Sequence, residues 1–163
     1  MKQWYETLFE NYARKYDKEP FTKGTLGEMI KKNLIAPCGM NCCLCIAYLR
    51  NKNKCPGCRE QSKPESNSKY CRKCIIKNCP IIQKNNWSYC STKCPKFPCR
   101  RLKQLDLRYK TKYEMSMIEN LSYIEENGIR RFLKKEKEKW QKDDMIYCVH
   151  RKEYMEVPEF KNH

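Results

Sequence analysis

Hydrophobic residues recur at helical spacing near both ends of the chain, and the period is lost between them. Trp4 and Leu8 belong to a pattern of three- and four-residue intervals that predicts a helix over residues 3–17. Residues 25–28 have the form of a capping box, which predicts a short second helix running through Lys32. These elements form an N-terminal helical segment, residues 1–33.

The helical period returns after residue 98. Apolar positions in residues 102–109 predict one helix, and a second capping box at residues 116–119 predicts the start of another. The Asn-Gly pair at residues 127–128 is a strong helix stop, because both residues tolerate the left-handed conformation. A last helix is expected over residues 129–140. The pattern predicts no element in residues 141–163, which we assign to a tail.

The middle of the chain has a different character. Residues 38–99 contain 12 of the 13 cysteines, and six of the eight prolines lie in this segment or just before it. Only residues 43–51 look helical within it. The two valines and the absence of alternating apolar runs argue against long strands. We therefore expect a mainly α fold, in which short helices flank an irregular cysteine-rich, metal-stabilised core within residues 34–140.

The composition indicates that something other than a large aliphatic core stabilises the fold. The chain has 10 Leu, 11 Ile, 2 Val and 5 Phe, which is 28 of 163 residues, and its net charge is +16. Chains this poor in large aliphatics and this charged are normally disordered. Cysteine is the remaining candidate stabiliser.

The sequence disfavours several classes of protein. The N-terminus has no signal-peptide pattern, and the longest uncharged run, residues 33–49, is too short and too broken to span a membrane. We expect a cytoplasmic protein, in which clustered cysteines bind metal more often than they form disulfides. The five glycines make no phosphate-binding loop and the two histidines make no HExxH motif, so we favour a protein that is not an enzyme.

The cysteine spacing indicates four-thiolate metal sites. Cys55 and Cys58 form one CxxC turn and Cys71 and Cys74 form a second, 12 residues later, which is close to zinc-site spacing. Iron–sulfur clusters also take four thiolates, and the Cys79-Pro80 pair is reminiscent of ferredoxins, although the full ferredoxin run is absent. We favour zinc, with an iron–sulfur cluster as the alternative.

The positive charge has two interpretations. Residues 38–99 hold 12 Lys or Arg against two Glu, and much of this excess can offset thiolate charge. Tyr70, Trp87 and Tyr89 lie among these lysines and could stack on bases, so nucleic-acid binding stays open.

Residues 33–140 resemble a family of uncharacterised cysteine-rich bacterial and archaeal proteins, classed as a domain of unknown function. The resemblance rests on IAPCGMNCCLCIAY, CPGCR, the cysteines at 71, 74 and 79, CSTKCPKFPC, and IENLSYIEENGIRRFLKKE. It implies metal ligation by cysteines, with no established activity. Family members often continue into a C-terminal zinc ribbon, of which this chain retains only Cys148 and His150. Residues 3–25 are similar to the leader of class I methyltransferases that use S-adenosylmethionine, but the catalytic core of that family is absent.

The family motifs account for eleven cysteines, whereas closed sites use ligands in fours. Cys43, Cys148 or His150 could complete the set, or one site could keep an open position. We favour Cys43, and expect Cys148 and His150 to be structural. The predicted ligands of about three zinc ions, at four thiolates each, are Cys38, Cys42, Cys43, Cys45, Cys55, Cys58, Cys71, Cys74, Cys79, Cys90, Cys94 and Cys99.

These features favour a non-enzymatic zinc protein that binds a protein partner through the helices flanking its cysteine-rich core. Two alternatives stay open: an iron–sulfur redox or sensor protein, and a zinc-dependent nucleic-acid-binding protein.

Overall fold

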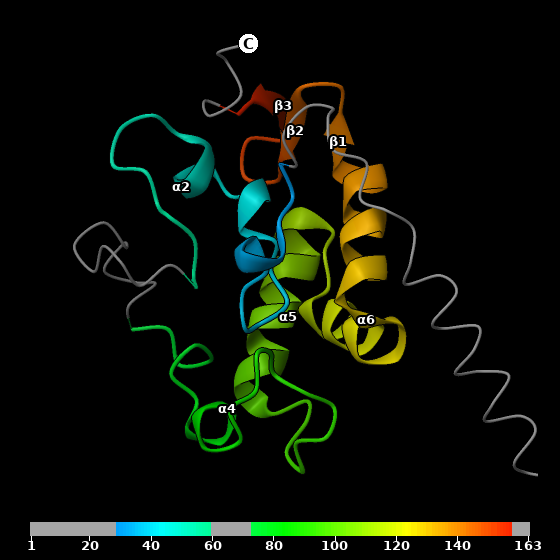
Figure 1. Ribbon diagram of the computed structural model, residues 1–163. Helices are drawn as coiled ribbons and strands as arrows, with labels where there is room; N and C mark the ends of the chain where they lie inside the picture. The colour runs from blue at the N-terminus through cyan, green and yellow to red at the C-terminus, as the bar shows by residue number, and fades with distance from the viewer. Residues whose placement is uncertain (1–28, 60–72, 158–163) are drawn as a thin grey trace, which may run out of the picture.

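Four α-helices, two 3-10 helices and a three-stranded sheet make up the regular structure of residues 29–59 and 73–157, the parts of the chain that the computed structural model describes (Figure 1). None of the described helices is long and apolar enough to cross a bilayer. The elements in order are the 3-10 helices η1 (Lys32–Leu34) and η2 (Cys42–Leu44), the helices α2 (Ile46–Leu49), α4 (Pro80–Lys84), α5 (Arg100–Tyr113) and α6 (Met117–Trp140), and the strands β1 (Gln141–Lys142), β2 (Met145–Cys148) and β3 (Glu153–Glu156).

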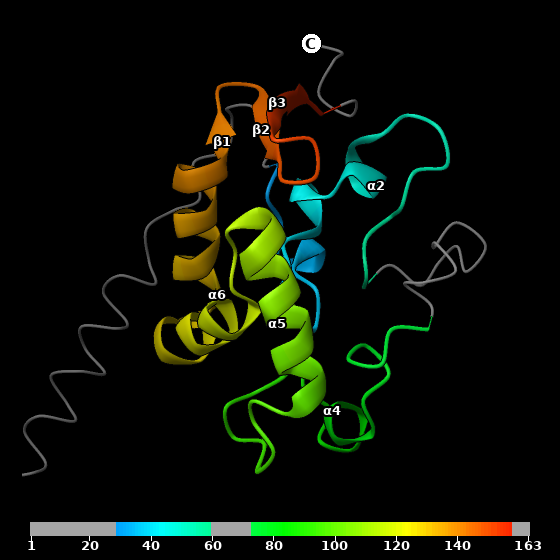
Figure 2. The same ribbon diagram turned by 180° about the vertical axis from the view of Figure 1, so that it is seen from behind.

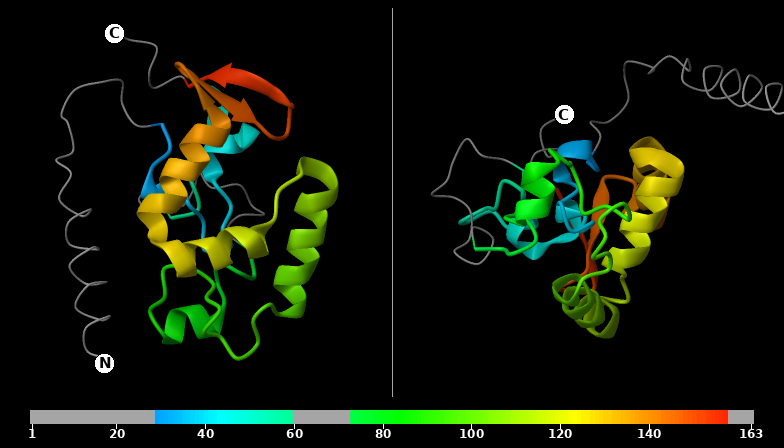
Figure 3. Two further views of the ribbon diagram at one scale, coloured as in Figure 1. Left: turned by 90° about the vertical axis from the view of Figure 1, so that its right-hand side faces the viewer. Right: turned by 90° about the horizontal axis from the view of Figure 1, so that it is seen from below.

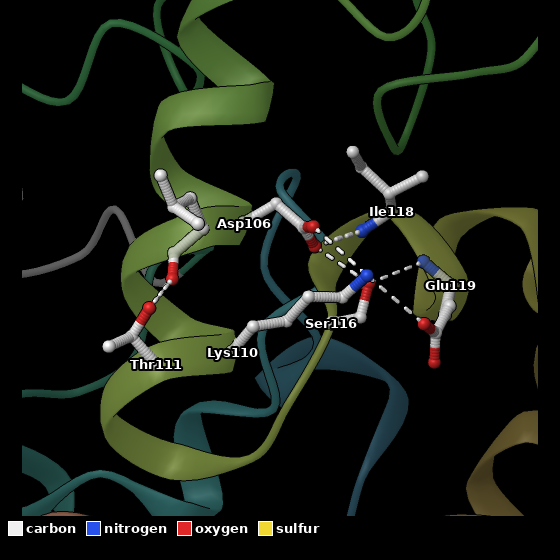
Figure 4. Close-up of polar contacts among 7 residues, drawn as sticks. Asp106, Lys110, Thr111, Ser116, Ile118 and Glu119 are labelled. Carbon is white, nitrogen blue, oxygen red and sulfur yellow. Dashed lines mark hydrogen bonds and ion pairs between the residues drawn. The ribbon is translucent and has the colours of Figure 1, made fainter.

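A buried carboxylate joins α5 to the start of α6 (Figure 4). Ser116 is the N-cap of α6, and its hydroxyl accepts a hydrogen bond from the Glu119 amide, as the capping box predicts. The same hydroxyl donates to Asp106 of α5 at 2.7 Å, and the Ile118 amide donates to the same Asp106 oxygen at 3.0 Å. Burial alone would raise the pKa of Asp106, but these hydrogen bonds and Lys110 outweigh it and lower the pKa.

The predicted stop at Gly128 is a break within α6. Gly128 adopts φ 79° and ψ 161°, a conformation that only glycine adopts easily, and the helix resumes after it. The two halves of α6 meet at an angle (Figure 3). Ile124 before the break and Phe132 after it pack with Ile35 in a small buried cluster, so the bend wraps α6 around the start of the cysteine-rich segment.

The segment after residue 140, where no element was expected, forms an antiparallel sheet in the order β1-β2-β3. The sheet lies at the opposite end of the molecule from α4 (Figures 1 and 2). Ile146 and Val149 are buried, and the Val149 amide donates to the Leu44 carbonyl of η2 at 3.1 Å. Strands of two to four residues are too short for alternation to be recognised in the sequence.

The other predicted helices are shortened or fall outside the described residues. The helix expected over residues 43–51 is divided into η2 and α2 by Cys45, which is extended. The expected helix over residues 3–17 and the capping box at 25–28 lie outside the described residues, and Met29–Lys31 is not helical. Helix α4 was not predicted, because five residues show no periodicity.

Asn41 joins the loop that carries Cys38 and Cys42, which we call the first cysteine loop, to α6. Its side chain is fully buried, accepts from the Cys43 amide, and donates to a Glu136 carboxylate oxygen at 3.0 Å. The other Glu136 oxygen accepts from the Trp140 indole at 3.3 Å. Burial raises the pKa of Glu136, and the two side-chain hydrogen bonds act against that rise. Glu136 is thus the common acceptor for the loop and for the end of α6.

Replacing Glu136 with Ala should destabilise the fold by about 3 kcal/mol, because two buried donors, on Asn41 and Trp140, lose their acceptor. The free energy of unfolding in urea measures the effect. Glu138→Ala is the matched control, since Glu138 carries the same charge on the same helix but is exposed. Equal effects in the two variants would contradict the role of Glu136.

Asp106→Asn should make the protein less stable at neutral pH by about 1–2 kcal/mol. The folded pKa of Asp106 lies below the ordinary value of 3.8, so its contribution is complete above that value and is lost as pH falls through the folded pKa. The stability difference between wild type and Asp106→Asn should therefore shrink in acid. Urea unfolding at pH 7 and at pH 3 tests this. A difference that is constant across this range would contradict it, and Asp144→Asn, an exposed carboxylate, controls for general charge effects.

Candidate metal-binding site

All twelve cysteines in the described residues are free thiols. Cys71, a predicted ligand, lies outside the described residues. We divide the others into sets by two criteria: the cavity that they line, and the effect of one sulfur's charge on the pKa of a nearby group.

Cys38, Cys42 and Cys74 form the first set. Burial, with the charges of Cys42 and Cys74, raises the pKa of Cys38 to about 12, although a hydrogen bond from the Met40 amide acts against this. We assign Cys45 to the same set because, after burial, Cys38 and Cys45 are the strongest influences that raise the pKa of Tyr109, so its phenol lies within electrostatic range of both sulfurs. We call these four cysteines the Cys38 group.

A tight turn positions the Cys38 group. The Gly39 amide donates to the Ala36 carbonyl at 2.9 Å, and the Ala36 amide donates to the Met40 carbonyl at 2.8 Å. Gly39 has φ +85°, and a methyl group added there would lie 3.0 Å from the Met117 carbonyl oxygen. Only glycine allows the loop to approach α6 this closely.

Cys79, Cys90, Cys94 and Cys99 form the second set, which we call the Cys90 group. All four line one cavity of about 540 Å³. Cys79 is the residue before α4, and Cys99 is the residue before α5. Burial raises the pKa of Cys90 to about 11, and the charges of Cys99, Cys94 and Cys79 add to the rise. The Ser91 amide donates a hydrogen bond to the Cys90 sulfur, which lowers the pKa in part.

The rest of the cavity is apolar, with a basic edge. It includes no carboxylate. The other lining residues are Ile75, Ile76, Pro80, Ile81, Ile82, Trp87, Phe97 and Leu102, with Lys96, Arg100 and Arg101.

Backbone and side-chain contacts hold the loop that carries the Cys90 group. The Cys90 amide donates to the Pro37 carbonyl at 2.8 Å, which places this loop beside the Cys38 turn. Glu125 of α6 accepts from the Ser91 hydroxyl at 3.2 Å and pairs with Lys93 at 3.2 Å. Both cysteine groups are thereby attached to the same helix.

The CxxC turn of Cys55 and Cys58 lies in the loop that follows α2. Cys55 is buried, Cys58 is half-buried, and the Cys55 amide donates to the Ala47 carbonyl at 2.7 Å. Gly57 between them has φ +103°, as a tight turn requires. The spacing suggested a shared site with Cys71 and Cys74; the structure places Cys74 within electrostatic range of Cys38.

Cys43 is fully buried, and its thiol donates a hydrogen bond to the Met29 carbonyl at 3.0 Å. A protonated thiol makes this contact, whereas a metal ligand is a thiolate. The contact favours the alternative in which Cys43 is structural, although the sequence led us to prefer it as the twelfth ligand.

Cys148 and His150 lie at the end of β2. Cys148 is fully buried, and the His150 ring lies 4.7 Å from the Tyr113 ring, centroid to centroid. Burial and the charge of Arg108 lower the pKa of His150. Their packing agrees with structural roles.

In the two described stretches of the chain, no three Cys, His, Asp or Glu side chains converge closely enough to hold a metal ion between them. Metal ligation by these cysteines therefore stays a prediction.

Comparison of the chain with protein-family models, with curated proteins and with solved structures finds no match. The family resemblance seen in the cysteine motifs likewise stays a prediction.

Proposed function

We propose that this protein binds metal ions through cysteine thiolates, and that the ions hold its cysteine loops against the α5–α6 scaffold. The observation that carries the proposal is the meeting of Cys79, Cys90, Cys94 and Cys99 around one cavity. They come from two loops, one before α4 and one between α4 and α5, over 21 positions of the chain. Buried structural thiols have no reason to gather in this way, whereas a thiolate-bound metal needs four of them together.

The acid–base properties of the thiols support the proposal. Burial and mutual repulsion raise the pKa values of Cys38 and Cys90, so ionising these groups without a cation is unfavourable. A bound metal ion supplies the missing positive charge and releases the thiol protons. The amides of Met40 and Ser91 already point at sulfur, as they do around metal-bound thiolates.

Zinc is the metal we propose for the Cys38 group. Four thiolates satisfy a closed tetrahedral zinc site, and such a site leaves no position for substrate. The protein then acts as a non-enzymatic, cytoplasmic module that presents its helices to a protein partner.

Exposed basic residues on α5 favour nucleic acid as a second candidate partner. The only acidic residue of this helix, Asp106, is buried and points to α6. The solvent-facing positions carry Arg100, Arg101, Lys103, Arg108, Lys110 and Lys112. A helix with this charge can contact phosphate groups.

Cys38→Ser should lower the bound zinc by about one equivalent, because closed sites need all four ligands. Zinc per folded chain, measured by elemental analysis, tests this. Cys43→Ser is the matched control: it removes a neighbouring buried thiol that is hydrogen-bonded to Met29, and zinc content should stay unchanged. Full zinc content in Cys38→Ser would contradict the proposal. Loss of one equivalent in Cys43→Ser would restore Cys43 as a ligand.

A chelator should also lower the temperature of the thermal unfolding transition of the wild type, since the aliphatic core is sparse.

Binding of DNA or RNA, if it occurs through α5, should weaken steeply as salt rises, because lysine and arginine contacts release counterions. The double substitution Arg108→Gln and Lys112→Gln should weaken binding several-fold and flatten the salt dependence by about two charges. Lys134→Gln with Lys137→Gln removes the same charge from exposed positions of α6 and is the control. Fluorescence anisotropy with labelled oligonucleotides provides the measurement. No binding at low salt would remove this candidate.

A further inference from the structure

The cavity of the Cys90 group is large for a single metal ion. Zinc binds thiolates at about 2.3 Å, so four ligands must close on one point. The four cysteines instead share an open pocket of about 540 Å³ with eleven other residues. Four thiolates spread around a volume suit a centre with several metal atoms, each bound by one cysteine.

We propose that the Cys90 group binds an iron–sulfur cluster of the four-cysteine class, with Cys79, Cys90, Cys94 and Cys99 as its ligands. This inference rests on the proposed function, metal binding by thiolates, and assigns a different metal centre to one of its sites. The Cys38 group keeps zinc.

The lining of the cavity supports a cluster. Eight of the fifteen lining residues are apolar, four of them isoleucine, and apolar surroundings reduce the contact of inorganic sulfide with water. The Phe97 and Trp87 side chains are half-buried and pack against the main hydrophobic core. A closed zinc site needs no apolar chamber of this size, because its ligands themselves enclose the ion.

Charge and hydrogen bonding agree with an anionic centre. A cluster bound by four thiolates carries net negative charge, and Lys96, Arg100 and Arg101 line the same cavity without any carboxylate. The Ser91 amide already donates to the Cys90 sulfur. Cys99 precedes the 14-residue helix α5, whose N-terminus favours negative charge. These contacts suit any anionic metal centre; the size and lining of the cavity distinguish a cluster from zinc.

The test uses the full chain, expressed with iron and purified without oxygen. Iron, acid-labile sulfide and zinc are measured per chain, together with absorption near about 400 nm, the region where iron–sulfur clusters absorb. The wild type should contain about four irons and four sulfides if the cluster is of the common cubane type. Cys94→Ser should lose the absorption band and the iron while keeping its zinc. Cys38→Ser should lose zinc while keeping the band.

Three outcomes would overturn the inference. A colourless wild type whose zinc falls in both Cys38→Ser and Cys94→Ser would place zinc in both groups, which leaves the proposed function intact. A band that is lost in Cys38→Ser but kept in Cys94→Ser would place the cluster in the other group. A wild type with neither zinc nor iron would end both proposals. The wild-type spectrum needs no variant to fold, and Cys148→Ser, a buried cysteine outside both groups, controls for loss of folding.

Discussion

The architecture depends on a buried hydrogen bond between Asn41 and Glu136. Asn41 lies in the first cysteine loop and Glu136 lies in the second half of α6, 95 positions later. Because both side chains are almost fully buried, neither can exchange the partner for water, so the contact selects one position of the loop on the helix. The close approach of Gly39 to Met117, and the hydrogen bond from the Asn120 amide group to the Gly39 carbonyl, secure the same loop on the first half of α6.

This attachment explains how a chain with few aliphatic residues can position its cysteines. The helices contribute their apolar faces to the core, and the loops are held by individual polar contacts: Asn41 to Glu136, Ser91 to Glu125, and Cys90 to Pro37. Such contacts place the thiols near one another, but each contributes little net stability. Metal binding is the additional stabilisation that we propose, and it would act where the polar contacts have already brought the sulfurs together.

Helix α5 connects the two cysteine groups to the rest of the fold. Cys99 of the Cys90 group precedes its first turn, and Tyr109 near its end lies within electrostatic range of Cys38 and Cys45. Asp106, between them, joins α5 to the N-terminus of α6. Helix α5 is therefore the element that both cysteine groups share.

The local features of this protein follow from its sequence alone. The helix after residue 99, the Ser116 cap and the break at Gly128 are confirmed, because each depends on neighbours within one or two helical turns. The concentration of cysteines in residues 38–99 was equally evident. Only the tertiary structure decided that Cys74 lies within electrostatic range of Cys38, that Cys79 lines one pocket with Cys90, Cys94 and Cys99, and that the last described residues form a sheet against η2. The spacing of cysteines in a sequence does not say which of them come together, because this depends on long-range packing and on buried pairs such as Asn41 and Glu136. Short strands likewise acquire their register from the surface they cover.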